Sequence, residues 1–121
     1  MKRDLDLVRK ILLAMEQLEH GFVQGDLHVE GHTEDEIGFH VFWIGEAGLA
    51  KVVENTHIQS QSPSAFPLHL TWEGYEFLEA AKDETLWGKA KSVVIKPAGG
   101  VAFGVLLDWL KAEAKSRLGM P

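Results

Sequence analysis

Apolar residues recur at helical spacing along most of the chain, and the pattern predicts five helices. In each stretch the apolar positions fall three and four residues apart, which places them on one face of an α-helix. Glycine or proline follows several of these stretches, where such residues commonly end a helix. The predicted helices span residues 4–19, 33–47, 72–82, 84–95 and 101–118.

The segment from Thr33 to Ile58 predicts a helix, a tight turn and then a strand. Thr33 can cap the start of the helix, and Glu36 lies three residues later, where it completes a capping box. Gly48 can adopt the left-handed conformation that ends a helix. A helix that leads directly into a strand in this way is typical of the third helix and first wing strand of a winged-helix domain.

The chain between the second and third predicted helices indicates a β-hairpin over residues 50–71. Its strands are predicted at 50–58 and 66–71, with a loop of Gln, Ser and Pro between them. A further short strand is predicted at 27–30, where it could pair with the edge of this hairpin. We therefore expect an α+β, winged-helix-like domain spanning residues 1–121, with a core at 1–83 and a C-terminal helical extension at 84–121.

Projection of the central helix at 100° per residue separates a core side from an aromatic side. The core side is formed by Ile37, His40, Val41, Ile44, Ala47 and Gly48. Phe39, Phe42 and Glu46 lie away from it and Trp43 lies at its edge, with small residues at positions 38 and 45 that would allow a surface to approach closely. Two interpretations stay open: another part of the fold covers these aromatic residues, or they form an exposed patch that binds a protein partner.

The charge distribution disfavours nucleic-acid binding through this helix. The net charge is −6, and residues 32–48 contain acidic residues but no Lys or Arg. Phosphate contacts need cations or other hydrogen-bond donors at the surface. If the chain does bind nucleic acid, the candidate contacts are Lys2, Arg3, Arg9 and Lys10.

No residue pattern predicts an enzyme, a metal site or a cofactor. The chain has no cysteine, which excludes disulfides and thiolate ligands. His28 and His32 lack a spacing that aligns two metal ligands in a strand and turn, and His40 is expected to hydrogen-bond a neighbour. The Gly-rich stretch at 97–104 lacks the Lys and Ser/Thr of a phosphate loop, so it predicts a break between helices.

The N-terminus alternates charged and apolar residues, unlike a signal peptide, and no apolar run is long enough to cross a bilayer. We therefore expect a cytoplasmic protein with no membrane partner.

Three stretches together carry a resemblance to a known family. They are MKRDLDLVRKILLAMEQLE near the start, EIGFHVFWIGEAGLA in the middle and LTWEGYEFLEAAKDETLWGKAK after the hairpin. In this order they resemble the domain-of-unknown-function family 2513, a group of uncharacterised bacterial and phage proteins. The resemblance implies a winged-helix-like fold and frequent carriage by phages and prophages. It implies no activity, ligand or catalytic residue.

Two classes of function fit these observations. The first is a non-catalytic interaction module, an accessory protein of phage or prophage type that binds a protein partner or itself. For self-association the expected dimer contacts are Trp87, Trp109 and Leu110. The second is a DNA-binding transcriptional regulator of winged-helix type. The absence of cations from the central helix favours the first.

Overall fold

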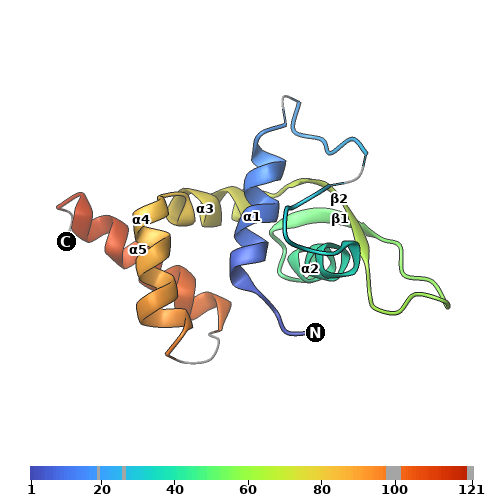
Figure 1. The fold of residues 1–121 in the computed structure, drawn as a ribbon. Helices are drawn as coiled ribbons and strands as arrows, with labels where there is room; N and C mark the ends of the chain where they lie inside the picture. The colour runs from blue at the N-terminus through green and yellow to red at the C-terminus, as the bar shows by residue number, and fades with distance from the viewer. Residues whose placement is uncertain (19, 26, 98–101, 120–121) are drawn as a thin grey trace. The chain divides into compact units, whose positions relative to one another are not determined.

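The computed structural model describes residues 1–18, 20–25, 27–97 and 102–119 (Figure 1). Its elements are α1 (Leu5–Glu16), α2 (Glu34–Glu46), β1 (Ala50–Glu54), β2 (Ala65–Leu70), α3 (Trp72–Ala81), α4 (Glu84–Ala90), the π-helical turn η1 (Lys91–Ile95) and α5 (Phe103–Arg117). The predicted α+β class is confirmed, and the helices with their antiparallel hairpin are consistent with a winged-helix-like arrangement. The chain divides into two compact units, Met1–Glu76 and Phe77–Pro121. The grouping of residues 1–121 into one domain, with a core at 1–83 and a helical extension at 84–121, stays a prediction.

Helix α1 begins where the sequence predicted and ends earlier. The Asp4 carboxylate accepts hydrogen bonds from the backbone N–H groups of Asp6 (2.9 Å) and Leu7 (3.2 Å), which caps the first turn. The helix ends at Glu16, because the backbone then bonds over three residues, from the Leu18 N–H to the Met15 carbonyl. The predicted last residue, position 19, lies outside the described residues.

Helix α2 has the boundaries that its caps predict. The Thr33 hydroxyl oxygen accepts from the Glu36 N–H at 3.1 Å, and the Glu36 carboxylate accepts from the Thr33 N–H at 3.2 Å, so the capping box is complete. Gly48 follows with φ of +77°, the left-handed conformation expected there. Ala47 and Gly48 are exposed rather than buried, which corrects the predicted core side at its C-terminal end. Both residues lie past the last helical turn, where the chain already leaves the core to enter β1.

The hairpin pairs β1 and β2 in antiparallel fashion, with a register shift between Lys51 and Val52. Strand β1 ends at Glu54, earlier than predicted, because Thr56 closes the loop. The Thr56 hydroxyl accepts from the Ser64 N–H at 2.8 Å and donates to the Ser64 carbonyl at 3.1 Å. The residues beyond Glu54 therefore form a bonded loop instead of a longer ladder.

The predicted strand at 27–30 is wrong, since none of these residues is in a strand. Gly25 and Gly31 have φ of +79° and +86°, which interrupts the extended conformation on both sides. The hairpin edge is contacted upstream instead, where the Val23 N–H donates to the Leu68 carbonyl at 2.9 Å. The segment between α1 and α2 thus reaches β2 through a backbone hydrogen bond of Val23.

The turn after α2 and the start of α3 are joined by Thr71. Its N–H donates to the Leu49 carbonyl at 3.1 Å, and its hydroxyl donates to the Gly48 carbonyl at 2.5 Å. The same hydroxyl oxygen accepts from the Gly74 N–H at 3.1 Å and caps α3. A Cβ on Gly74 would overlap the Leu49 carbonyl oxygen, so only glycine fits there. The EAGL stretch at residues 46–49 and the LTWEG stretch at residues 70–74 therefore pack against each other.

The C-terminal unit is built around the ring of Phe77, which lies 6.2 Å from the Trp87 ring and 5.0 Å from the Phe103 ring between centroids. Asp83 caps α4 by accepting from the Leu86 N–H at 2.8 Å. The predicted helix at 84–95 is realised as α4 followed by η1. The predicted helix at 101–118 is α5, and positions 98–101 of the Gly-rich stretch lie outside the described residues.

Candidate interaction surface on α2

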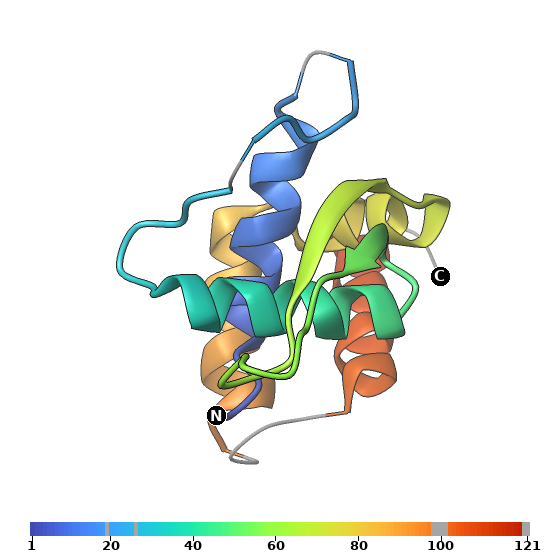
Figure 2. The same cartoon turned by 90° about the vertical axis from the view of Figure 1, so that its right-hand side faces the viewer.

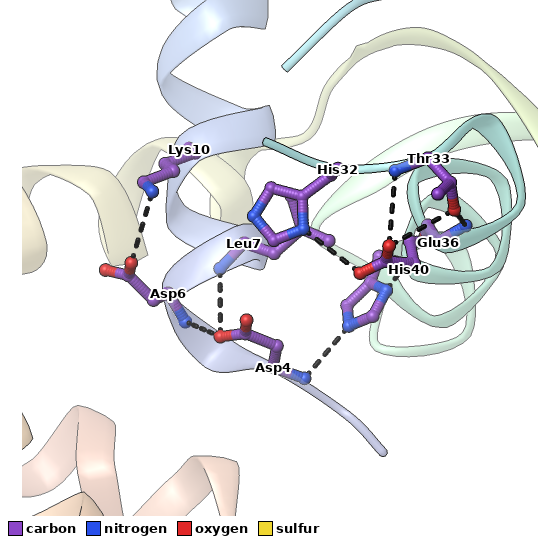
Figure 3. A network of polar contacts seen from close by, with 8 residues as sticks. All are labelled: Asp4, Asp6, Leu7, Lys10, His32, Thr33, Glu36 and His40. Carbon is purple, nitrogen blue, oxygen red and sulfur yellow. Dashed lines mark hydrogen bonds and ion pairs between the residues drawn. The ribbon is translucent and has the colours of Figure 1, made fainter. Parts of the chain in front are cut away.

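Helix α2 packs against α1 and the hairpin (Figure 2), and His40 fixes its contact with the N-terminal segment. His40 is 1% exposed. Its Nε2 accepts from the Asp4 N–H at 2.9 Å, so the ring hydrogen sits on Nδ1, which donates to the Glu36 carbonyl at 2.7 Å (Figure 3). As the sequence predicted, His40 is a hydrogen-bonded structural residue.

A second set of polar contacts holds the first turn of α2. The Glu36 carboxylate lies 3.2 Å from His32 Nδ1 (Figure 3). The hydrogen bond from His32, and after it the one from the Thr33 N–H, hold the pKa of Glu36 below its usual value. A carboxylate at this position also suits the positive end of the helix dipole. The start of α2 is therefore held by the contacts of Glu36 with His32 and Thr33, and its middle by the hydrogen bonds of His40.

The aromatic side chains of α2 pack on one another. The rings of Phe39 and Trp43 stack with centroids 4.0 Å apart, and Phe42 meets Phe39 edge-to-face at 6.2 Å. The edge of His40 contacts Trp43 at 5.0 Å, which orients the indole. All three aromatic side chains are half-buried, and we call Phe39, Phe42 and Trp43 the aromatic ridge.

The small residues beside Phe42 serve the hairpin of the same chain. A Cβ on Gly45 would overlap the Val52 side chain, and a Cβ on Gly38 would overlap the Ser64 hydroxyl. The interpretation that these glycines let a partner approach is wrong, because Val52 of β1 and Ser64, the residue before β2, already occupy that side. A partner therefore cannot reach the ridge from the side that Val52 and Ser64 occupy.

Acidic residues flank the aromatic ridge. At 100° per residue, Asp35, Phe39, Phe42 and Glu46 fall within an arc of about 60° on α2, and both acidic residues are exposed. The unit that carries the ridge, residues 1–76, has thirteen Asp and Glu against five Lys and Arg, a formal charge of −8 with neutral histidine. The surface around the ridge is thus strongly anionic.

The structure does not gather the candidate nucleic-acid contacts into one open patch. Lys2 and Arg3 are exposed in the N-terminal segment. Lys10 pairs with Asp6 at 3.4 Å, and Arg9 is only 5% exposed. Arg9 is therefore enclosed by the fold, and Lys10 is engaged by a neighbour.

The three candidate dimer contacts differ in how far they are exposed. Trp87 and Leu110 are buried, while Trp109 is half-buried with the Lys89 Nζ 6.0 Å from its ring. Lys89 also pairs with Glu113 at 3.1 Å. Of the three residues, only Trp109 reaches the surface of its unit.

Two hollows and two exposed side chains were missed from the sequence. A cavity of about 190 Å³ lies between α2 and β2, and an open hollow of about 800 Å³ lies beside Lys51, His69 and Trp72. Trp72 is 77% exposed, and Ile58 in the hairpin loop is fully exposed. The exposure of Ile58 could have been inferred from its position as an isolated apolar residue beside a loop of Gln, Ser and Pro. Trp72 occupies the first position of a helix, where periodicity does not yet define a face.

Within residues 1–18, 20–25, 27–97 and 102–119, no three His, Asp or Glu side chains gather as metal ligands. None of the helices in that part of the chain has the length and apolar content needed to cross a bilayer.

The fold and its junctions define an α+β protein with a winged-helix-like order of elements. The chain belongs to the family described as "Hypothetical protein (DUF2513)", whose model matches residues 2–101 and so includes every element from α1 to η1. An uncharacterised protein of Haemophilus influenzae is 30% identical over 97 residues, which covers 78% of this chain and 79% of that protein. No solved structure matches the chain.

Proposed function

We propose that this chain is a non-catalytic interaction module that binds a protein partner through the aromatic ridge of α2. The observation that carries the proposal is the packing of Phe39, Phe42 and Trp43 on one another, half-buried, outside the buried face of α2. Large aromatic side chains are the residues that most often anchor protein interfaces. An accessory role of phage or prophage type is the setting that the family resemblance implies.

The charge of this unit supports a protein partner over DNA. Helix α2 contains no cation, and exposed carboxylates stand at both ends of the ridge. DNA phosphates would be repelled by that surface, since each phosphate contact needs a donor. The order of elements favours the second candidate, a DNA-binding regulator, but a fold alone does not specify function.

Substitution of Phe42 tests the proposal. The wild-type chain, immobilised and exposed to a nuclease-treated lysate of host cells, should capture a protein partner. With the purified partner, Phe42→Ala should weaken binding by about 2 kcal/mol, or roughly 30-fold, because a buried anchor is lost. Phe22→Ala is the matched control, since Phe22 is an exposed ring of the same unit whose edge contacts His69 of β2 instead of the ridge.

The same variant shows whether the ridge belongs to the core instead. If Phe42→Ala lowers the free energy of unfolding by about 3 kcal/mol or more, a cavity has formed and the ridge is core. That result, or partner binding unchanged by Phe42→Ala, would contradict the proposal. Thermal melting beside the wild type separates the two effects.

Self-association through the C-terminal helices is the other form that the interaction could take. The exposed Val105 and the half-buried Trp109 lie four residues apart on α5 and so share one face. A symmetric pairing of this face would cover both side chains. Sedimentation at high micromolar concentration measures it directly, and a monomer throughout would remove this form of the proposal.

A further inference from the structure

We infer that the segment of the partner that docks on the aromatic ridge is a basic amphipathic helix; this inference rests on the proposed function. The occupant is indicated by charge complementarity. Asp35 and Glu46 are exposed at the two ends of the ridge, and none of the described residues forms an ion pair with either carboxylate. A cation from the partner can therefore meet each of them.

Four residues of α2, which we call the acidic–aromatic stripe, have a spacing that favours a helix as the partner segment. Asp35, Phe39, Phe42 and Glu46 follow one another at intervals of four, three and four residues, the spacing at which helix side chains interdigitate with a second helix. Eleven residues of α-helix rise about 16 Å. A partner helix lying along α2 matches this length with two cations eleven residues apart and two aliphatic residues between them.

An extended chain would fit the same stripe differently. At about 3.3 Å per residue, its two cations would be only about five residues apart. The two conformations of a bound peptide therefore require different sequences, which makes the inference testable with designed peptides.

The rest of the unit restricts how the helix approaches. The hairpin closes the side of α2 that carries Gly38 and Gly45, so the partner helix cannot approach the ridge from that side. Hydrogen bonds of His40 and Glu36 already hold α2 in place, so little ordering is required on binding. The formal charge of −8 on residues 1–76 attracts a basic segment over longer distances.

The test uses the full chain and three synthetic helical peptides of about 18 residues, a length of five turns. The matched peptide carries Lys at two positions eleven residues apart, with Leu four and seven residues after the first Lys. A second peptide has the same composition with these residues scattered around the helix, and a third has Glu in place of Lys. We expect the matched peptide to bind at least about tenfold more tightly than the other two, with affinity falling as salt rises.

The double variant Asp35→Asn/Glu46→Gln should lose most of that preference. The control is Glu54→Gln/Glu73→Gln, which removes the same charge from exposed residues of the same unit and should retain the preference. Equal binding of the matched and scattered peptides, or an unchanged preference in the Asp35→Asn/Glu46→Gln variant, would overturn the inference.

The natural partner distinguishes this inference from the proposed function. If its binding falls with Phe42→Ala but not with Asp35→Asn/Glu46→Gln, the ridge is the binding surface and the basic helix is wrong. If its binding is unaffected by Phe42→Ala, the proposed function itself fails.

Discussion

Gly74 shows how a single residue joins two stretches of this chain that are far apart in sequence. Its backbone packs directly on the Leu49 carbonyl, which leaves no room for a side chain. The neighbouring Thr71 donates to the carbonyls of Gly48 and Leu49 from the same turn. A glycine in a helix normally costs stability, so its presence in the first turn of α3 is explained by this contact.

Gly74→Ala should therefore destabilise the Met1–Glu76 unit by about 1–3 kcal/mol, the cost of forcing an extra methyl group into a packed site. Gly88→Ala is the control, because a Cβ at that helical position meets nothing within 4 Å. That change should be neutral or stabilise the protein by up to about 1 kcal/mol. Chemical denaturation of both variants measures the difference in the free energy of unfolding. Equal effects of the two substitutions would show that the Leu49 contact does not require a glycine at position 74.

At the scale of the element, α2 depends on both of its ends and on one buried side chain. The capping box fixes its start, Gly48 its end, and His40 its position against α1. The aromatic ridge and its flanking carboxylates are displayed on a helix that is already held in place, so their relative positions persist without a partner.

The first turn of α2 makes the stability of its unit depend on pH. Because the pKa of folded Glu36 lies below its ordinary value of 4.5, the carboxylate contributes stability that is fully present above that value. The contribution is lost as pH falls through the folded pKa. We expect Glu36→Gln to melt below the wild type at neutral pH, and the difference to vanish at acid pH.

Glu34→Gln is the matched control for this prediction. Glu34 lies in the same turn but forms none of the hydrogen bonds that Glu36 makes with His32 and Thr33. Its substitution should change the melting temperature less and with a weaker dependence on pH. A difference between wild type and Glu36→Gln that stays constant from neutral to acid pH would contradict the assignment.

For the whole molecule, charge is divided between the two units. Residues 1–76 have a formal charge of −8, and residues 77–121 have seven Lys and Arg against five Asp and Glu. The winged-helix-like order of elements thus occurs in the more acidic unit, where a surface for reading DNA would need cations.

We predict weak, non-specific binding to duplex DNA that disappears as salt approaches physiological concentration, because only a few cations can contribute. Titration at about 50 and 150 mM salt measures this, the range over which phosphate contacts weaken strongly. Lys2→Gln/Arg3→Gln should reduce any residual binding, since both residues are exposed in the N-terminal segment. Submicromolar binding to a defined operator at physiological salt would restore the DNA-binding regulator as the better function.

Local chemistry in the sequence was enough to predict the order of the helices and the hairpin and the limits of α2, but it also predicted a strand at 27–30 that does not form. Caps and hydrophobic periodicity depend on residues within a few positions of each other, as with Thr33 and Glu36. The same information predicted that Phe39 and Phe42 lie outside the core side of their helix with Trp43 at its edge, and the acidity of that region follows from composition.

Only the tertiary structure decided which surfaces these elements cover. The glycines at 38 and 45 indicated a close approach, but not that the hairpin of the same chain makes it. The partner of His40 is a backbone N–H 36 residues away, and the hairpin edge is contacted by Val23 instead of residues 27–30. Such contacts depend on the path of the whole chain, because backbone groups donate and accept alike at every residue and local sequence does not distinguish them.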